Sequence, residues 1–200
     1  MNAQLVEENR QLKQERDTLR MLIDSLPDRV FVKDRQSRFL INNPAHVQAM
    51  GATSQDEVIG KTDLDIFPAD LARQYYEDER ALMESGQPLN REEMAVNVGT
   101  GEARWLQTRK MPLRDKQGVI VGLMGISRDV TERKRAEEAL DSAQRLLQAM
   151  LDNVPDRIYF KDTQSRFIKL SKALATRLGV KDAELAVGKT DFDFNLSEKA

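Results

Sequence analysis

The sequence contains no cysteine, which excludes disulfide frameworks, thiolate metal sites and cysteine nucleophiles. Its single histidine, His46, excludes a histidine triad and a multi-histidine metal site. No apolar run approaches the roughly 20 residues of a membrane span, and the N-terminus is polar where a secretory signal would be apolar. We therefore expect a cytoplasmic protein with no membrane segment in this chain.

Neither sign of charge is in excess. The chain has 31 basic and 33 acidic residues and a net charge of -2. Such a balance gives no general attraction to nucleic acid or to an anionic membrane, so no nucleic-acid partner is expected. With 200 residues, 40% of them hydrophobic, the chain can form one good core with additional pieces.

Residues 1–25 are predicted to form an N-terminal coiled-coil helix. Residues 3–25 lack proline and glycine and are rich in helix-forming residues. Leucine recurs at the seven-residue spacing of a coiled coil, at Leu5, Leu12, Leu19 and Leu26. The second seam of the heptad is poor, so the alternative is an amphipathic helix that lies on its own domain.

Residues 26–130 are predicted to form an α+β domain on an antiparallel sheet. Short helices are expected after Pro44 and after Ser54, where Glu57 has capping-box spacing. The clearest helix covers residues 69–85 and is followed by Gly86. Period-two patterns and turn residues predict five strands, at 30–32, 39–41, 91–98, 103–113 and 119–128.

A second long helix is predicted over residues 131–153. Asp129 and Glu132 have capping-box spacing at its start. Its apolar stripe alternates steps of four and three, through Ala136, Leu140, Ala143, Leu147, Met150 and Val154. Because this coiled-coil linker lies between two domain-like segments, it is not a terminal tail.

An internal repeat indicates that a whole unit has been duplicated. Residues 24–65 align without gaps onto residues 152–193, at an offset of 128, with 17 identities in 42 positions. Lys33 matches Lys161, and Asp63 matches Asp191. Residues 154–200 have no copy of the three late strands, so we expect them to be the N-terminal half of a second domain. The chain is then a fragment of a longer protein or a truncated gene product.

Four segments together resemble the PAS domain family: PDRVFVKDRQSRF, INNPAHVQAMG, GKTDLDIFP and MPLRDKQGVIVGLMGISRDVTERK. The resemblance covers residues 22–130 completely and 150–200 as a half domain. It implies a five-stranded antiparallel sheet with helices on one face, here flanked by long coiled-coil helices. It also implies a sensor and dimerisation module of histidine kinases in two-component systems, diguanylate cyclases or transcription regulators. No such output domain lies in this chain, so we expect no enzymatic activity from it.

The resemblance also bears on cofactors. Heme-binding relatives place their histidine on the longer helix, here 69–85, which has none, and the repeat places Leu174 opposite His46. Light-sensing relatives use a cysteine for flavin photochemistry, and this chain has none. We therefore expect neither heme nor flavin, and the cofactor stays unknown.

Two short segments resemble known binding motifs, but both motifs are incomplete. Gly60-Lys61-Thr62 imitates the end of a phosphate-binding loop, but Gln55 stands where that loop needs glycine, so nucleotide binding is rejected. Asp63 and Asp65 could suggest a cation, but no glycine or downstream glutamate completes a calcium loop. Capping and turn formation are the predicted roles of both residues.

Alternation along the three late strands predicts a small-molecule pocket on the helix-covered face of the sheet. Its candidate lining is Met94, Val96, Leu106, Thr108, Lys110, Leu123 and Ser127. Trp105, Met124 and Ile126 then fall on the outer face. Lys110 and Arg109 are the best candidates to meet an anionic ligand. The alternative is a filled core without ligand.

The leading hypothesis is a sensory module that relays a signal through its linker helix, with Asp129, Thr131 and Glu132 at the junction. We predict a parallel homodimer through Leu5, Leu12, Leu19, Leu140, Leu147 and Met150. One alternative is part of a histidine kinase or diguanylate cyclase whose catalytic domain lies beyond residue 200; another is a purely structural dimerisation module. Residues 155–200 should exchange amide hydrogens faster than residues 30–128.

Overall fold

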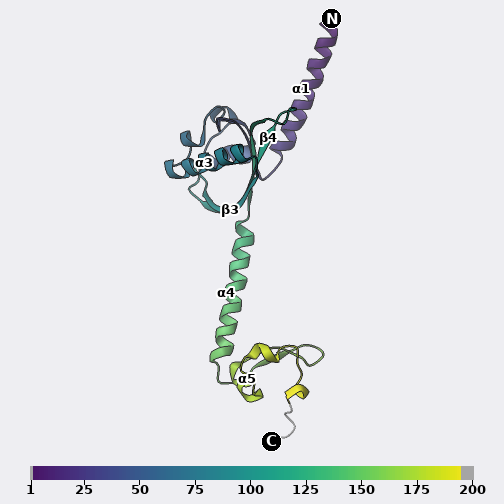
Figure 1. The fold of residues 1–200 in the computed structure, drawn as a ribbon, viewed down its shortest axis with the longest axis vertical. Coiled ribbons are helices and arrows are strands. Elements are labelled where there is room, and N and C mark those ends of the chain that lie inside the picture. The colour runs from purple at the N-terminus through teal and green to yellow at the C-terminus, as the bar shows by residue number, and fades with distance from the viewer. Residues whose placement is uncertain (1, 195–200) are drawn as a thin grey trace. The chain divides into compact units, whose positions relative to one another are not determined.

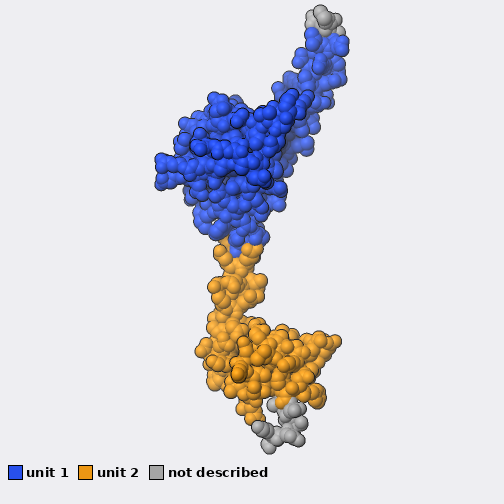
Figure 2. Space-filling view, viewed as in Figure 1, with its two compact units in different colours: residues 1–134 blue, residues 135–200 orange. Residues whose placement is uncertain are grey.

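The computed structural model describes residues 2–194 of the chain. It divides into two compact units, residues 1–134 and residues 135–200 (Figure 2). Within the described residues, none of the helices is both long enough and apolar enough to cross a membrane.

The first unit is built on a five-stranded antiparallel sheet in the order β2-β1-β5-β4-β3. The strands are β1 (Arg29–Asp34), β2 (Phe39–Asn42), β3 (Leu89–Val96), β4 (Ala103–Arg114) and β5 (Ile120–Asp129). The helices are α1 (Asn2–Asp24), α2 (Pro44–Ala49) and α3 (Ala69–Ser85), with single 3-10 turns η1 (Gln55–Glu57) and η2 (Asp63–Asp65). The predicted α+β fold and its five strands are confirmed, and the opening strand pairs with the closing one.

Local hydrogen bonds explain why the first hairpin forms at its sequence. The carboxylate of Asp34 accepts hydrogen bonds from the backbone N–H groups of Gln36 and Arg38, both at 2.9 Å. Ser37 turns the chain in the left-handed region, at φ 57°. Aspartate favours this kind of turn because its short side chain replaces a backbone acceptor.

Helix α3 lies over one face of the sheet (Figure 1). Helix α3 packs against β4 and β5, and α2 packs against β1. The core beneath them consists of Phe31, Phe39, Val47, Met50, Val58, Leu82 and Leu123. Burial of each large apolar side chain contributes about 1.5–3 kcal/mol relative to exposure, so this cluster fixes the sheet against the helices.

Strands β1 and β5 approach each other closely at two glycines. A Cβ atom at Gly122 would lie 2.1 Å from the carbonyl oxygen of Lys33. A Cβ atom at Gly125 would lie 2.1 Å from the ring of Phe31. Only glycine therefore fits at this seam, and the ring of Phe31 lies across β5.

The structure corrects the predicted phase of β3. Met94 was expected on the inner face, but its side chain is 58% exposed and it pairs with Trp105 of β4. The inner face of this strand instead carries Glu93 and Ala95. Arg91 shares that phase and forms an ion pair with Asp78 of α3. Arg91 also pairs with Glu93, so the inward charges compensate one another with the help of Asp78 on the helix.

The predicted capping interaction of Ser54 is also corrected. The side chain of Ser54 makes no capping hydrogen bond at the start of η1, and the Glu57 carboxylate accepts instead from the backbone and hydroxyl of Thr53. Asp65 does form a capping box with Thr62, as expected for one of the two aspartates.

The second unit repeats the opening elements of the first at the offset of 128 residues. Helix α4 (Thr131–Asn153) leads to β6 (Tyr159–Lys161), β7 (Phe167–Leu170), α5 (Lys172–Leu178), η3 (Ala183–Ala186) and η4 (Asp191–Phe194). Its small core consists of Phe167, Leu170, Ala175, Leu178 and Ala186. Within residues 2–194, β6 pairs with β7 alone, and Tyr159 is 55% exposed.

Candidate functional site

A cavity of about 50 Å³ lies inside the first unit, between the sheet and its helices. Four predicted residues from β4 and β5 line it and are buried, namely Leu106, Thr108, Lys110 and Ser127. Val96 also lines it but is 48% exposed, so it lies at the margin.

Three other predicted residues lie elsewhere. Leu123 is fully buried in the apolar core and does not line the cavity. Met94 is on the outer face, as described above. Arg109 is exposed and is also absent from the cavity wall, so of the two basic residues expected to meet an anionic ligand only Lys110 lies there.

A network of buried charges forms part of the cavity wall. The ammonium group of Lys33 contacts the carboxylate of Asp63 and donates to Glu79 Oε1 at 2.8 Å. The ammonium group of Lys110 donates to the same Glu79 oxygen at 2.7 Å. These side chains are almost inaccessible, and Glu79 Oε2 has no hydrogen-bond partner among the described residues. Asp63 is therefore not the capping residue that was predicted, but one end of a four-residue ion network.

The network controls the protonation of its two acids in opposite ways. Burial raises the pKa of Asp63 above its ordinary value, and Lys33 opposes that effect. Burial also acts to raise the pKa of Glu79, but Lys33 and Lys110 together outweigh it, so the pKa is lowered. Glu79 is therefore the firmly ionised centre of the network.

His46 is a buried, neutral residue of the cavity wall. Its ring stacks on Phe31, with ring centroids 4.7 Å apart. Burial lowers the pKa of His46 well below its ordinary value, and Lys33, Arg29 and Lys110 lower it further. Its Nδ1 lies 2.8 Å from Asn42 Oδ1, so the two side chains share a hydrogen bond. The imidazole is thus a packed side chain, at the position where the repeat has Leu174.

The remaining polar groups of the wall are weaker donors and acceptors. The hydroxyl groups of Thr108 and Ser127 lie 3.0 Å apart across β4 and β5. Burial raises the pKa of Tyr75, with Glu93 acting in the same direction, so this phenol stays protonated. The ammonium of Lys110 lies 5.0 Å from the ring centre of Tyr75. The cavity therefore offers charges, hydroxyls and aromatic faces within a small space.

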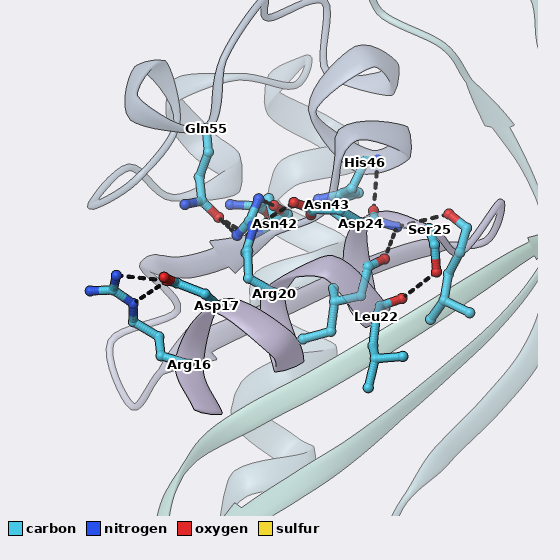
Figure 3. A network of polar contacts seen from close by, with 12 residues as sticks. Arg16, Asp17, Arg20, Leu22, Asp24, Ser25, Asn42, Asn43, His46 and Gln55 are labelled. Atoms are coloured by element: carbon cyan, nitrogen blue, oxygen red, sulfur yellow. Dashed lines mark hydrogen bonds and ion pairs between the residues drawn. The ribbon is translucent and has the colours of Figure 1, made fainter. Parts of the chain in front are cut away.

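A second polar network connects the cavity wall to α1 (Figure 3). Arg20 donates to the carbonyl oxygen of Asn42 at 2.8 Å and to Gln55 Oε1. The same Gln55 oxygen accepts from the backbone N–H of Asn42 at 2.8 Å. The side-chain amide of Asn43 donates to three carbonyl oxygens at the end of α1 and just beyond it, including that of Asp28 at 2.8 Å. Since Asn42 also holds His46, the network joins a cavity residue to the N-terminal helix.

The predicted relay residues form the junction between β5 and α4. Asp129 Oδ1 accepts from the backbone N–H of Thr131 at 2.9 Å, and its other oxygen accepts from Arg104 at 2.7 Å. Although partial burial opposes it, the hydrogen bonds with Thr131 and Arg104 lower the pKa of Asp129 to about 2. Thr131 Oγ1 accepts from the backbone N–H of Trp105 at 3.0 Å, and Glu132 lies exposed in the first turn of α4.

The residues predicted for dimerisation are exposed on the two long helices of a single chain. Those of α1 are Leu5, Leu12 and Leu19, and those of α4 are Leu140, Leu147 and Met150. Exposed large apolar residues in register are available to a partner, and the association itself stays a prediction.

Sequence reasoning missed much of the charge network, above all Glu79. Glu79 lies on a helix that looks like an ordinary surface helix, so no local pattern predicts its burial. A signal for the other pair was present, because Lys33 and Asp63 are both identical in the repeat. Among residues 2–194 there is no group of three or more His, Asp or Glu side chains that could hold a metal ion.

Comparisons with known proteins agree with this architecture. The family model for the PAS fold matches residues 23–135. The methanogenesis regulatory histidine kinase FilI of Methanothrix harundinacea is 30% identical over 141 residues, which are 70% of this chain and 16% of FilI. The chain thus spans about a sixth of that relative's length.

Two solved structures are similar in fold and sequence. The PAS domain of Bordetella pertussis BvgS is 26% identical with a TM-score of 0.52, and the match covers 66% of this chain and 98% of that one. The Vibrio cholerae VqmA dimer in the absence of its target DNA is also 26% identical with a TM-score of 0.53, covering 56% of this chain and 50% of that one. With its five-stranded sheet, helix-covered cavity and matching family model, the chain belongs to the PAS family of sensory domains.

Proposed function

We propose that the chain is a cytoplasmic sensory and dimerisation module that binds a small molecule in the cavity of its first unit. The signal passes through α4 to an output domain elsewhere in the protein. One observation carries this proposal: β5 has Ser127 in the cavity wall and, two residues later, Asp129, whose carboxylate accepts from the backbone N–H of Thr131 at the start of α4. A displacement of β5 at the cavity therefore acts on the first turn of the linker helix.

The relay is tested by filling the cavity without any ligand. The Ser127→Leu variant places a larger side chain at the cavity wall, and Val121→Leu is its control, because Val121 is exposed on the same strand. Amide exchange of residues 131–137 should change severalfold in the first variant and stay unchanged in the second. Equal exchange in both variants would contradict a relay from the cavity through α4.

The dimer is proposed to be parallel, with each helix stripe facing its own copy. The absence of native cysteine makes single-cysteine cross-linking clean. In a parallel pair, identical core positions approach within disulfide range, whereas positions off the stripe do not. Leu147→Cys should therefore form a cross-linked dimer on oxidation, and Ser142→Cys should not. A monomer in sedimentation at tens of micromolar would contradict the proposal.

The identity of the output is proposed from relatives. FilI is named as a regulatory histidine kinase, and a protein named as a diguanylate cyclase from Vibrio cholerae is 28% identical over 121 residues. If the chain is part of a kinase or cyclase, the catalytic domain lies outside the residues described above. The gene sequence that encodes the complete protein decides between these outputs.

A second function is a structural dimerisation module without ligand. The small volume of the cavity favours it, because a space of about 50 Å³ can also hold a few water molecules. Native mass spectrometry of the purified protein separates the two functions, since a copurified small molecule supports the sensor.

A further inference from the structure

The charged groups around the cavity are balanced. Three basic side chains line it, Arg29, Lys33 and Lys110. Three acidic side chains also line it, Asp63, Glu79 and Glu93. His46 is neutral, as described above, and Asp63 is in direct contact with the ammonium of Lys33. The formal charges of the residues that line the cavity therefore sum to zero.

Charge balance restricts what the cavity can accept. An ion moved from water into a buried space loses its hydration and needs an opposite charge that is not already used. Here Lys33 is shared between Asp63 and Glu79, and Glu79 is shared between Lys33 and Lys110. An anion or a cation beside Lys33, Glu79 or Lys110 would have to compete with these pairs, whereas a neutral molecule would leave them intact.

The wall nevertheless offers hydrogen bonds of both kinds. Lys110 donates one hydrogen bond, to Glu79, although its ammonium carries three N–H groups. Glu79 Oε2 is buried and accepts none among the described residues. The hydroxyl groups of Thr108 and Ser127 can each donate or accept. A ligand with one donor and one acceptor would match these groups better than an apolar one.

The volume of the cavity limits the size of a ligand. Each water-sized occupant needs at least about 10–15 Å³ of cavity volume, and the cavity measures about 50 Å³. It therefore holds a molecule of roughly four non-hydrogen atoms without rearrangement.

Resting on the proposed sensory function, we infer that the cavity selects a small, net-neutral polar molecule that carries both a hydrogen-bond donor and an acceptor, such as a short amide. This assignment concerns the charge class of the ligand. It follows from three basic and three acidic residues around one space and from the unmatched polar atoms among them.

Three probes of one shape test the charge class. Acetamide, acetate and acetamidinium are planar, have four non-hydrogen atoms and differ in charge, being neutral, anionic and cationic. We expect acetamide to bind the full chain with a Kd of about 0.1–10 mM, in the range for so small a ligand. Acetate and acetamidinium should bind at least about tenfold more weakly. The readout is the shift of the backbone amide resonances of Leu106 and Ser127 in titrations.

A charge-altered variant makes the test specific to the cavity. Glu93→Gln leaves the wall with one excess positive charge, so acetate should become the tightest of the three probes. Glu92→Gln is the matched control, because Glu92 lies next to it on β3 and does not line the cavity. That control should keep the preference for acetamide. If Glu93→Gln fails to fold by Trp105 fluorescence, Lys110→Met provides the opposite change, with acetamidinium as the expected preference.

The outcomes separate this inference from the proposed function. Tighter binding of acetate or acetamidinium by the unaltered protein overturns the charge class and leaves the sensor intact. The same holds if none of the probes binds but a copurified charged molecule shifts the cavity resonances. If neither the probes nor any copurified molecule shifts them, the cavity holds water only and both proposals are wrong.

Discussion

The two units begin with the same residues and place them in different surroundings. In the first unit the side chains of Lys33 and Asp63 are 1% and 6% exposed, and Glu79 joins them. In the second, their counterparts Lys161 and Asp191 form the same ion pair but are 19% and 52% exposed. The difference comes from α3 and from β3 to β5, which have no counterpart among the described residues of the second unit.

The comparison shows that the ion pair needs only the opening hairpin and the later 3-10 turn, which both units have. The cavity also needs elements that only the first unit has. Both units form the pair from residues 30 positions apart. Only the first unit adds Glu79 from α3 and Lys110 from β4. The same ion pair is therefore exposed at the surface of the second unit and part of a buried charge network in the first.

The largest expected effect is a loss of stability when the lysine is removed from the first unit, compared with its removal at the equivalent position of the second. Lys33→Ala leaves Asp63 without a partner in a buried site, and breaking a buried pair costs about 3–5 kcal/mol. Lys161→Ala breaks an exposed pair, at a cost below about 1 kcal/mol. Urea unfolding followed by the fluorescence of Trp105, the only tryptophan, measures the first unit, and amide exchange measures the second. Similar losses in both units would contradict the comparison.

A second test compares the two hairpins directly. Strand β1 pairs with β2 and β5, but β6 pairs with β7 alone among the described residues. Amides of residues 158–170 should therefore exchange at least about a hundredfold faster than those of residues 29–129, because local opening is easier at an open edge. Equal protection in a verified monomer would show that the opening elements suffice for a stable fold.

The third test uses the position where the repeat exchanges His46 for Leu174. The pKa of His46 is lowered in the folded state, so below pH 6.5 the unfolded state binds a proton that the folded state does not. The free energy of unfolding should fall as the pH drops from 7 to 5, by up to about 1.4 kcal/mol per pH unit.

The variant His46→Leu isolates that slope. It copies the second unit and removes the only histidine of the chain. The raised pKa of Asp63 acts in the opposite sense but is present in both proteins, so their difference reports His46. Chemical denaturation at several pH values measures it, and identical slopes would contradict the neutral, buried imidazole.

The smallest expected effect concerns the long helix that precedes each opening hairpin, α1 in the first unit and α4 before the second. Arg20 in α1 bonds Asn42 and Gln55, whereas its counterpart Gln148 in α4 accepts from Lys169 at 3.4 Å beside an open cleft of about 330 Å³. Arg20→Gln copies the second unit and should weaken the docking of α1 by about 1 kcal/mol.

Amide exchange of residues 18–24 measures that loss. Arg16→Gln is the control, because Arg16 pairs with its exposed neighbour Asp17 (Figure 3). A control that loosens α1 as much as Arg20→Gln would show that charge, not the contact with Asn42, holds the helix.

The sequence predicts the elements of this fold better than their inward faces. Hydrophobic periodicity and cap residues place α3 and α4 with the bounds that the structure shows. The phase of β3 was wrong because Met94 and Val96 are apolar and alternate, whereas Arg91 and Glu93 turn inward and pair with each other, and Arg91 also pairs with Asp78 of α3. Such compensation depends on tertiary contacts, which no local pattern contains.

Some residues of the candidate site could be predicted from the sequence and others could not. Thr108, Lys110 and Ser127 could be predicted because alternation on two neighbouring strands sets one face. Glu79 could not, because its burial is stabilised by lysines from two distant strands. The repeat preserved Lys33 and Asp63 together, which is the kind of long-range information that periodicity lacks.

The missing side chain at Gly125 makes room for the ring of Phe31. The ring of Phe31 occupies the place where a Cβ atom of residue 125 would lie, and the same ring forms part of the cavity wall. Any larger residue at position 125 would collide with this ring, so the ring or β5 would have to move. A single methyl group on the backbone of β5 would thus disturb the cavity wall as well as the sheet.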